Sequence, residues 1–145
     1  MRARDFLQLA HSLAAGSLEV EWRSAISRAY YGAFHVARTL LLQCGFSVPR
    51  GEQAHGFLWL RLANAGNTDV QEAGNDLQHL RHHRNRADYD LGFSLDQATA
   101  IAQVQEAEEI IRTLEDAVRQ PTKKQITDAI KIYERKVLKT VTWHP

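Results

Sequence analysis

Residues 18–44 read LEVEWRSAISRAYYGAFHVARTLLLQC, and this stretch decides the fold. Its apolar side chains recur every three or four residues, the spacing that places them along one side of an α-helix. They are Trp22, Ala25, Ile26, Ala29, Tyr30, Ala33, Phe34, Ala37, Leu40 and Leu41. Because the stripe continues along the whole stretch, we predict one long helix from about residue 18 to residue 44, at the centre of the fold.

Shorter segments with helical spacing precede and follow this stretch. We expect further helices at about residues 3–15, 54–65, 68–89, 95–119 and 121–139. Glycine and proline break the pattern between several of them, as at Gly16, in GFSVPRGEQ (45–53) and at Gly66. No segment shows the two-residue alternation of a β-strand, so we predict an all-α protein. We expect one helical domain over residues 1–120 and a basic helical extension over residues 121–145.

Bulk composition narrows the class of protein. The chain has 145 residues, of which 44% are hydrophobic and 24% charged, and this suits a soluble globular domain. No stretch is suited to crossing a membrane, and polar residues interrupt the apolar run near the start, so we expect a cytoplasmic protein without a secretory signal. The single cysteine, Cys44, excludes an internal disulfide and any zinc site that needs several cysteines. The net charge of +1 gives no global bias toward nucleic acid, so any such bias must be local.

One local cluster has the required charge. Residues 80–90 read LRHHRNRADYD, on a segment that otherwise has a helical pattern with a thin apolar stripe. Cationic and proton-transferring side chains gathered on one or two helical turns suit contact with phosphate groups. The alternative is a solvated basic face with ion pairs to the acidic helix at 95–119, which fits Arg86 best.

Three segments together resemble the HEPN family (higher eukaryotes and prokaryotes nucleotide-binding domains). Residues 24–41, SAISRAYYGAFHVARTLL, resemble the long helix of that family, with its Tyr-Tyr pair followed by small-Phe-His and a leucine run. Residues 81–89 end in Arg-x-x-Ala-Asp-Tyr and are similar to the family's second signature. Between them, EQAH (52–55) lies where these domains often carry a Lys/Gln-x-His entry into the third helix. The resemblance covers about residues 3–119.

The resemblance implies an antiparallel bundle of four to five helices that dimerises through its motif-bearing face. The best-known members are metal-independent ribonucleases of toxin-antitoxin, phage-defence or CRISPR-linked systems, with an Arg followed four to six residues later by a His. Others bind nucleotides, RNA or protein partners. We therefore expect a homodimer that binds or cleaves RNA, or binds a nucleotide, in a prokaryotic defence or toxin-antitoxin setting. The alternative is a non-catalytic module that assembles with a nucleotidyltransferase, an effector or a CRISPR-type partner. We expect no cofactor.

The chain departs from the family's ribonuclease motif at the histidine. If the motif begins at Arg84, the histidine position falls on Tyr89; if it begins at Arg81, the position falls on Ala87. The pair Arg50 and His55 has the right spacing but lies in a loop and a helix start. We interpret that spacing as coincidence and His55 as a hydrogen-bonding residue at the start of a helix.

The residues expected to act fall into three sets. Arginine can stabilise the charge of a phosphorane-like transition state, and histidine can transfer the protons of RNA cleavage. The candidate catalytic residues are Arg81, His83, Arg84 and Tyr89. The candidate residues for binding nucleic acid or a nucleotide are Tyr31, His35, Arg81, His82, Arg84, Asn85 and Arg86. The residues expected to be structural are Tyr30 and Asp88, with Asp88 accepting bonds from Arg84 or Arg28.

Tyr89 and two other features have open interpretations. Tyr89 either packs with its hydroxyl satisfied, contacts a nucleotide, or is a target for modification. His79, His82 and His83 share one helical face, but no cysteine or close carboxylate set completes a metal site, so we expect none. The Lys/Arg-rich helix after Pro121 either packs on the bundle, exchanges onto a dimer mate, or contacts phosphates.

Overall fold

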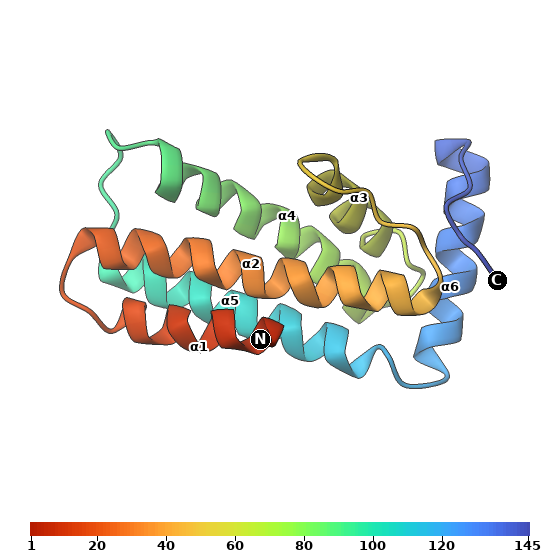
Figure 1. Cartoon of the computed structure of the whole chain (residues 1–145), viewed down its shortest axis with the longest axis horizontal. Helices are drawn as coiled ribbons and strands as arrows, with labels where there is room; N and C mark the ends of the chain where they lie inside the picture. Colours follow the sequence, from red (N-terminus) through yellow and green to blue (C-terminus); the bar gives the residue numbers. More distant parts are fainter.

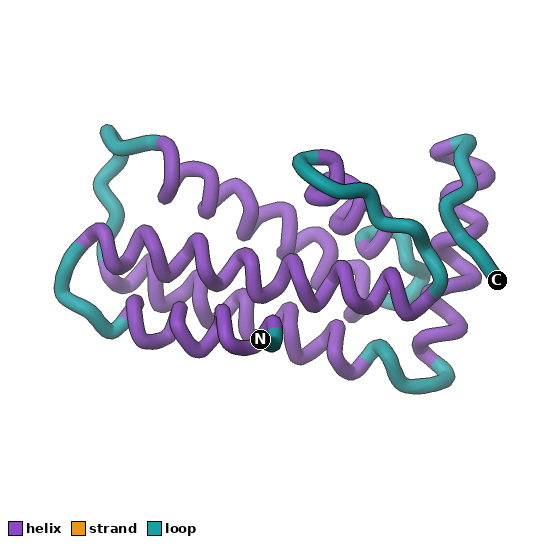
Figure 2. The backbone as a smooth tube through the Cα atoms, in the orientation of Figure 1, coloured by secondary structure: helices purple, strands orange, loops and turns teal.

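The computed structural model describes all 145 residues. The protein consists of helices and has no strands (Figure 1). Its helices are α1 (Ala3–Ala14), α2 (Glu19–Cys44), α3 (Gln53–Leu62), α4 (Thr68–Tyr89), α5 (Gln97–Asp116) and α6 (Thr122–Tyr133), followed by a π-helical turn, η1 (Glu134–Leu138). Loops and turns join them, and Figure 2 shows how much of the backbone is helical. The all-α prediction is confirmed.

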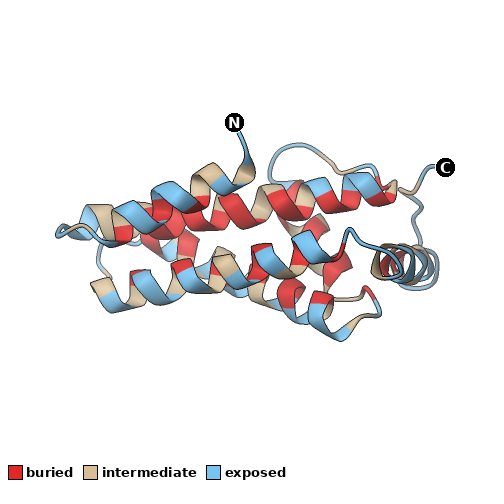
Figure 3. Ribbon diagram, turned by 90° about the horizontal axis from the view of Figure 1, so that it is seen from below, coloured by how far each residue is buried: buried red, intermediate tan, exposed pale blue.

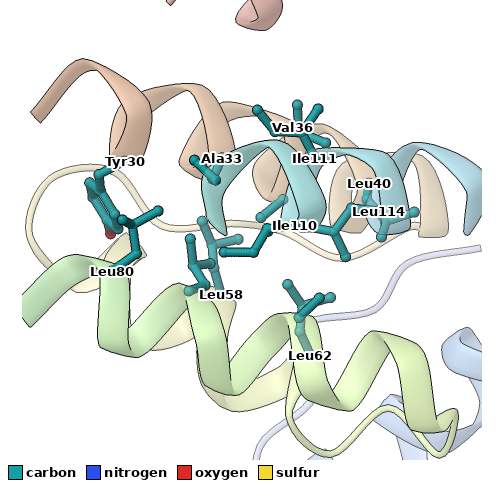
Figure 4. Packing of buried hydrophobic residues seen from close by; sticks show 14 of the residues in the cluster. Tyr30, Ala33, Val36, Leu40, Leu58, Leu62, Leu80, Ile110, Ile111 and Leu114 are labelled. Carbon is teal, nitrogen blue, oxygen red and sulfur yellow. The ribbon is translucent and has the colours of Figure 1, made fainter. Parts of the chain in front are cut away.

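Helix α2 is the centre of the bundle, as its sequence predicts. It packs against α1, α4 and α5, which lie along its length, while the short α3 packs on α4 and α2 (Figure 1). The predicted stripe is buried except for Trp22 and Phe34, which are partly exposed. Figure 3 shows the buried positions of the helices on the sides that face other helices, and Figure 4 shows Tyr30, Ala33 and Leu40 of α2 near labelled residues of α3, α4 and α5. The core therefore forms where the apolar stripes face one another.

Capping residues set the ends of the helices that carry the charge cluster and its neighbour. The side chain of Asn67 accepts a hydrogen bond from the backbone nitrogen of Val70 at 3.1 Å and starts α4. Asp96 does the same for Thr99 at 2.8 Å, so α5 starts two residues later than predicted. Helix α2 ends at Gly45, whose φ of 105° favours a residue without a side chain.

The C-terminal extension is attached to the bundle. Helix α6 lies across one end of the bundle, and its Ile126 and Ile130 belong to the main hydrophobic cluster (Figure 1). Beyond η1 the chain returns to the start of the α2–α3 loop, where Trp143 Nε1 donates to the carbonyl of Cys44 at 2.9 Å. Two other apolar residues of this extension, Ile132 and Val137, are exposed instead. Trp143 of the tail packs against the main hydrophobic cluster, so the tail covers part of this end of the bundle.

A buried carboxylate fixes this attachment. Oε2 of Glu134 accepts a hydrogen bond from Nε of Arg61 on α3 at 2.7 Å, and Oε1 accepts one from the backbone nitrogen of Thr142 at 2.9 Å. Arg61 and Glu134 are both buried. We call Arg61, Glu134 and Thr142 the C-terminal clasp, because together they join α3, η1 and the tail.

None of the helices combines the length and the apolar character that a bilayer-spanning segment needs.

Candidate functional site

Arg84 of α4 is held rigidly against α2. Its Nε donates to Oδ2 of Asp88 at 2.9 Å, Nη1 to Oδ1 of Asn85 at 3.1 Å, and Nη2 to the hydroxyl of Tyr31 at 2.8 Å. Asp88 lies one helical turn further on, a separation at which helix side chains meet. Only 8% of Arg84 is exposed. The guanidinium has therefore a fixed orientation, with part of its donor capacity still free.

Asp88 links the two motif helices. Besides Arg84, its Oδ2 accepts a hydrogen bond from the hydroxyl of Ser27 on α2 at 3.1 Å. Arg28, the other partner considered for Asp88, instead lies over the rings of Phe6 and Tyr31, at 5.8 Å and 5.6 Å. The arrangement is a short polar network across the α2–α4 contact, and it orients Arg84.

Arg81, one turn before Arg84, has few partners. Its Nη2 lies 3.5 Å from Oε2 of Glu52, whose side chain is 86% exposed. Its Nε is buried without a hydrogen-bond partner, and no other buried side-chain nitrogen or oxygen in the protein lacks one. Buried polar groups in native proteins nearly always have a partner. Arg81 is thus a partly exposed cation whose hydrogen-bonding capacity is largely unused.

His55 enters the same site from α3. Its Nδ1 lies 2.5 Å from the hydroxyl of Tyr30, and its ring packs against those of Tyr30 and Phe34, with centroids 5.6 Å and 4.9 Å away. Burial lowers the pKa of His55, and the charges of Arg81 and Arg84 lower it further. The imidazole is therefore neutral near pH 7 and lies close to both arginines.

The remaining polar residues of the cluster point in several directions. His82 and Arg86 are exposed, and the guanidinium of Arg86 lies 3.7 Å from the ring of Phe93 rather than beside an α5 carboxylate. Arg81 pairs with Glu52, Arg84 pairs with Asp88, and Arg86 forms no ion pair, so the alternative of ion pairs to α5 is not what forms. His83 is partly buried, and burial, followed by the charge of Arg86 and the neighbouring histidines, lowers its pKa.

The two positions that the family motif would give to a histidine differ in their burial. Ala87 is buried in a small second cluster with Ile26 and Leu95, so a side chain there faces the core. Tyr89 is 73% exposed, and its ring lies 5.5 Å from the guanidinium of Arg84. Of the two alignments, the one on Tyr89 points at the site.

Tyr31 and His35 contact different helices. Tyr31 hydrogen-bonds to Arg84, whereas the ring of His35 stacks on that of Phe6 in α1, with centroids 5.3 Å apart. Residues four apart on an α-helix differ by about 40° around its axis, and this turn directs His35 toward α1. The structure thus brings Tyr31, but not His35, next to the arginines. Burial and the charge of Arg38 lower the pKa of His35.

No three His, Cys, Asp or Glu side chains come together in a way that could hold a metal ion. Of the three histidines on α4, His79 and His82 are exposed, whereas His83 is partly buried.

The comparison with known families identifies the same family that residues 24–41 and 81–89 resemble. A family model described as the HEPN domain matches residues 1–118. The chain belongs to the HEPN family. Among curated proteins and among solved structures nothing matches. The family supports a role connected with nucleotides or RNA in general, and the HEPN match ends before α6, so the C-terminal clasp lies largely outside it.

The site of this HEPN domain has the residue types that suit an anion. It brings together two arginines from α4, a tyrosine from α2 and a neutral histidine from α3, with one exposed carboxylate at the side. The sequence patterns identified the arginines and Tyr31 but not the positions of Glu52 and His55. The segment EQAH (52–55) indicates a family pattern at these positions, but the sequence does not show that its side chains reach α4.

Proposed function

We propose that this HEPN domain binds a phosphate group of RNA or of a nucleotide at the site around Arg81 and Arg84, in a prokaryotic defence or toxin-antitoxin setting. Arg84 provides a fixed guanidinium, and Arg81 a second, less constrained one. Arginine suits this ligand because its planar donors match the oxygens of a phosphate group.

The under-used guanidinium of Arg81 carries the proposal. The guanidinium donates no hydrogen bond within the protein, and its one carboxylate contact, to the exposed Glu52, is 3.5 Å long. The exposed part of this side chain therefore has more to gain from an anionic ligand than a paired surface arginine. Arg84 provides the second guanidinium of the site. Because its orientation is already fixed in the protein, holding it in place costs no further free energy when a ligand binds.

A homodimer is part of this proposal. The surface that α1 and α2 form next to the site carries partly exposed aromatic and cationic side chains. They are Phe6, Arg28, Tyr31, Phe34 and His35. Pairing through this face around a two-fold axis would place two copies of the arginine pair near one another. Light scattering after size exclusion measures the mass of the assembly directly.

The test is RNA binding by the full chain. Arg81→Ala removes the less constrained cation at small structural cost, and we expect it to weaken binding of a mixed-sequence single-stranded RNA roughly tenfold. The control is Arg112→Ala on α5, which removes the same charge from an exposed ion pair with Glu109 and should change affinity little. Equal affinities of the two variants would refute the proposal.

The same RNA shows whether the site cleaves. In a metal-independent endoribonuclease, Arg81 and Arg84 would stabilise the transition-state charge, with proton transfer by His82 or His83. Incubation with a chelator present, followed by gel analysis, separates cleavage from binding alone. Intact RNA with a steep salt dependence of binding supports a binding domain without ribonuclease activity.

A second candidate is a non-catalytic module for a nucleotidyltransferase, an effector or a CRISPR-type partner. One residue at the C-terminal end of α4 favours it: Tyr89 is 73% exposed. An exposed tyrosine beside Arg84 is accessible to a modifying enzyme. Mass spectrometry of the protein purified from its native host would show an added group on Tyr89.

A further inference from the structure

His55 lies outside both motif helices, yet it is built into the same site. It belongs to the first turn of α3 and is only 6% exposed. Its ring packs against Tyr30 and Phe34, and the hydroxyl of Tyr30 is hydrogen-bonded to Nδ1. The position of the ring is therefore fixed by packing on two sides and by one hydrogen bond.

The hydrogen bond, taken with the protonation of its two partners, indicates which ring nitrogen carries the proton. The hydroxyl of Tyr30 has Nδ1 of His55 as its one hydrogen-bond partner, and burial raises the pKa of Tyr30, so the hydroxyl keeps its proton. Burial lowers the pKa of His55, so the ring is neutral. A neutral ring that accepts at Nδ1 carries its hydrogen on Nε2.

The Nε2–H donor is available to a ligand. It has no hydrogen-bond partner in the protein, and it is not completely buried, because the one completely buried side-chain nitrogen or oxygen without a partner is Nε of Arg81. The charged groups that act on the ring are Arg81 and Arg84 of α4 and Glu52 just before α3. The donor thus lies in a region of positive charge with one exposed carboxylate.

We propose that His55 is a third ligand-binding residue of this site, donating a hydrogen bond from Nε2 of its neutral ring to the phosphate held by Arg81 and Arg84. The inference rests on the proposed function and adds a residue to it from a third helix. It explains why Tyr30, on the buried side of α2, has its hydroxyl directed at a histidine. Tyr30 is then a positioning residue that sets the tautomer.

Two substitutions separate the two nitrogens. The amide nitrogen of glutamine can take the place of Nε2, whereas that of asparagine takes the place of Nδ1, so His55→Gln retains the donor and His55→Asn loses it. With a mixed-sequence single-stranded RNA and fluorescence anisotropy, we expect His55→Asn to weaken binding roughly tenfold. We expect His55→Gln to stay within about threefold of the unaltered protein. Thermal unfolding of each variant checks that both are folded.

Comparing the His55 and Arg81 variants tests the role of His55 separately from the phosphate site. If Arg81→Ala weakens binding but folded His55→Asn does not, the role of His55 is refuted and the phosphate site stands. If neither weakens binding, the phosphate site is refuted as well. Nitrogen-15 shifts of the His55 ring near pH 7 give a readout that does not depend on RNA, and a hydrogen found on Nδ1 in place of Nε2 overturns the inference.

Discussion

Removing the carboxylate of Glu134 should destabilise the protein more than removing an exposed carboxylate from the neighbouring helix α6. Glu134 is 1% exposed and accepts hydrogen bonds from Arg61 Nε, from the backbone nitrogen of Thr142 and from the hydroxyl of Thr142. In Glu134→Ala the guanidinium of Arg61, itself 5% exposed, stays buried without a counter-charge. The cost comes mainly from that uncompensated charge.

The magnitude follows from the burial of the pair. Breaking a buried ion pair by removing one partner costs about 3–5 kcal/mol, a large part of the ~5–15 kcal/mol that stabilises a typical domain. For a chain of this size, the corresponding fall in Tm is on the order of 10 °C. The matched control is Asp128→Ala on α6, which breaks a surface pair with Lys124 and should cost much less than Glu134→Ala.

The pH dependence gives an independent check. Burial alone would raise the pKa of Glu134, but hydrogen bonds from Thr142 and Arg61 outweigh it, and the net pKa lies below the usual 4.5. The unfolded chain therefore binds this proton first as the pH falls, so the carboxylate stabilises the fold above that value and loses its effect at lower pH. Urea unfolding of both variants across this range tests the argument. A Glu134→Ala loss no larger than that of Asp128→Ala, or one that grows as the pH falls below 4.5, would refute it.

Two further predictions concern the packing of α3 and the charge at the site. Gly74→Ala should destabilise the fold by about 1–3 kcal/mol, because a Cβ there would lie 2.5 Å from the backbone nitrogen of Ala63. Gly56→Ala on α3 meets nothing within 4 Å and should stabilise by up to about 1 kcal/mol, so urea unfolding that ranks the pair the other way contradicts the packing. Glu52→Gln should raise RNA affinity a few-fold, since the exposed carboxylate competes with phosphate for Arg81; an unchanged affinity in anisotropy titrations would show that Glu52 does not compete.

The fold was predictable because most of its determinants are local. The apolar stripe of α2 and the break at Gly45 that ends it depend on residues a few positions apart. For the same reason the Arg84–Asp88 contact, one helical turn long, was among the expected ones. Helix α4 runs over residues 68–89, as its sequence predicts. Such features are visible in a sequence because helix geometry fixes which neighbours meet.

The parts that could not be predicted depend on contacts between distant segments. His55 reaches the site through Tyr30, 25 residues earlier, and helical spacing within α3 does not show which helix its first turn will face. The tail beyond η1 has no periodic pattern from which its packing could be predicted. Glu134 lies among lysines and arginines, and nothing in that pattern distinguishes it from an exposed charged residue. Trp143 is the one large aromatic residue near this end of the sequence.

The attachment of the C-terminal tail also makes the order of assembly matter. The bond from Trp143 to the carbonyl of Cys44 spans 99 residues, so the chain gains it only after nearly all of the protein is in place. Closing so large a loop is entropically costly, and such contacts tend to form late and to open first. Helix α3, which carries His55, is fastened to this late segment through Arg61. Brief openings of the tail, visible as fast amide exchange, are therefore expected to loosen one wall of the site while α2 and α4 stay closed.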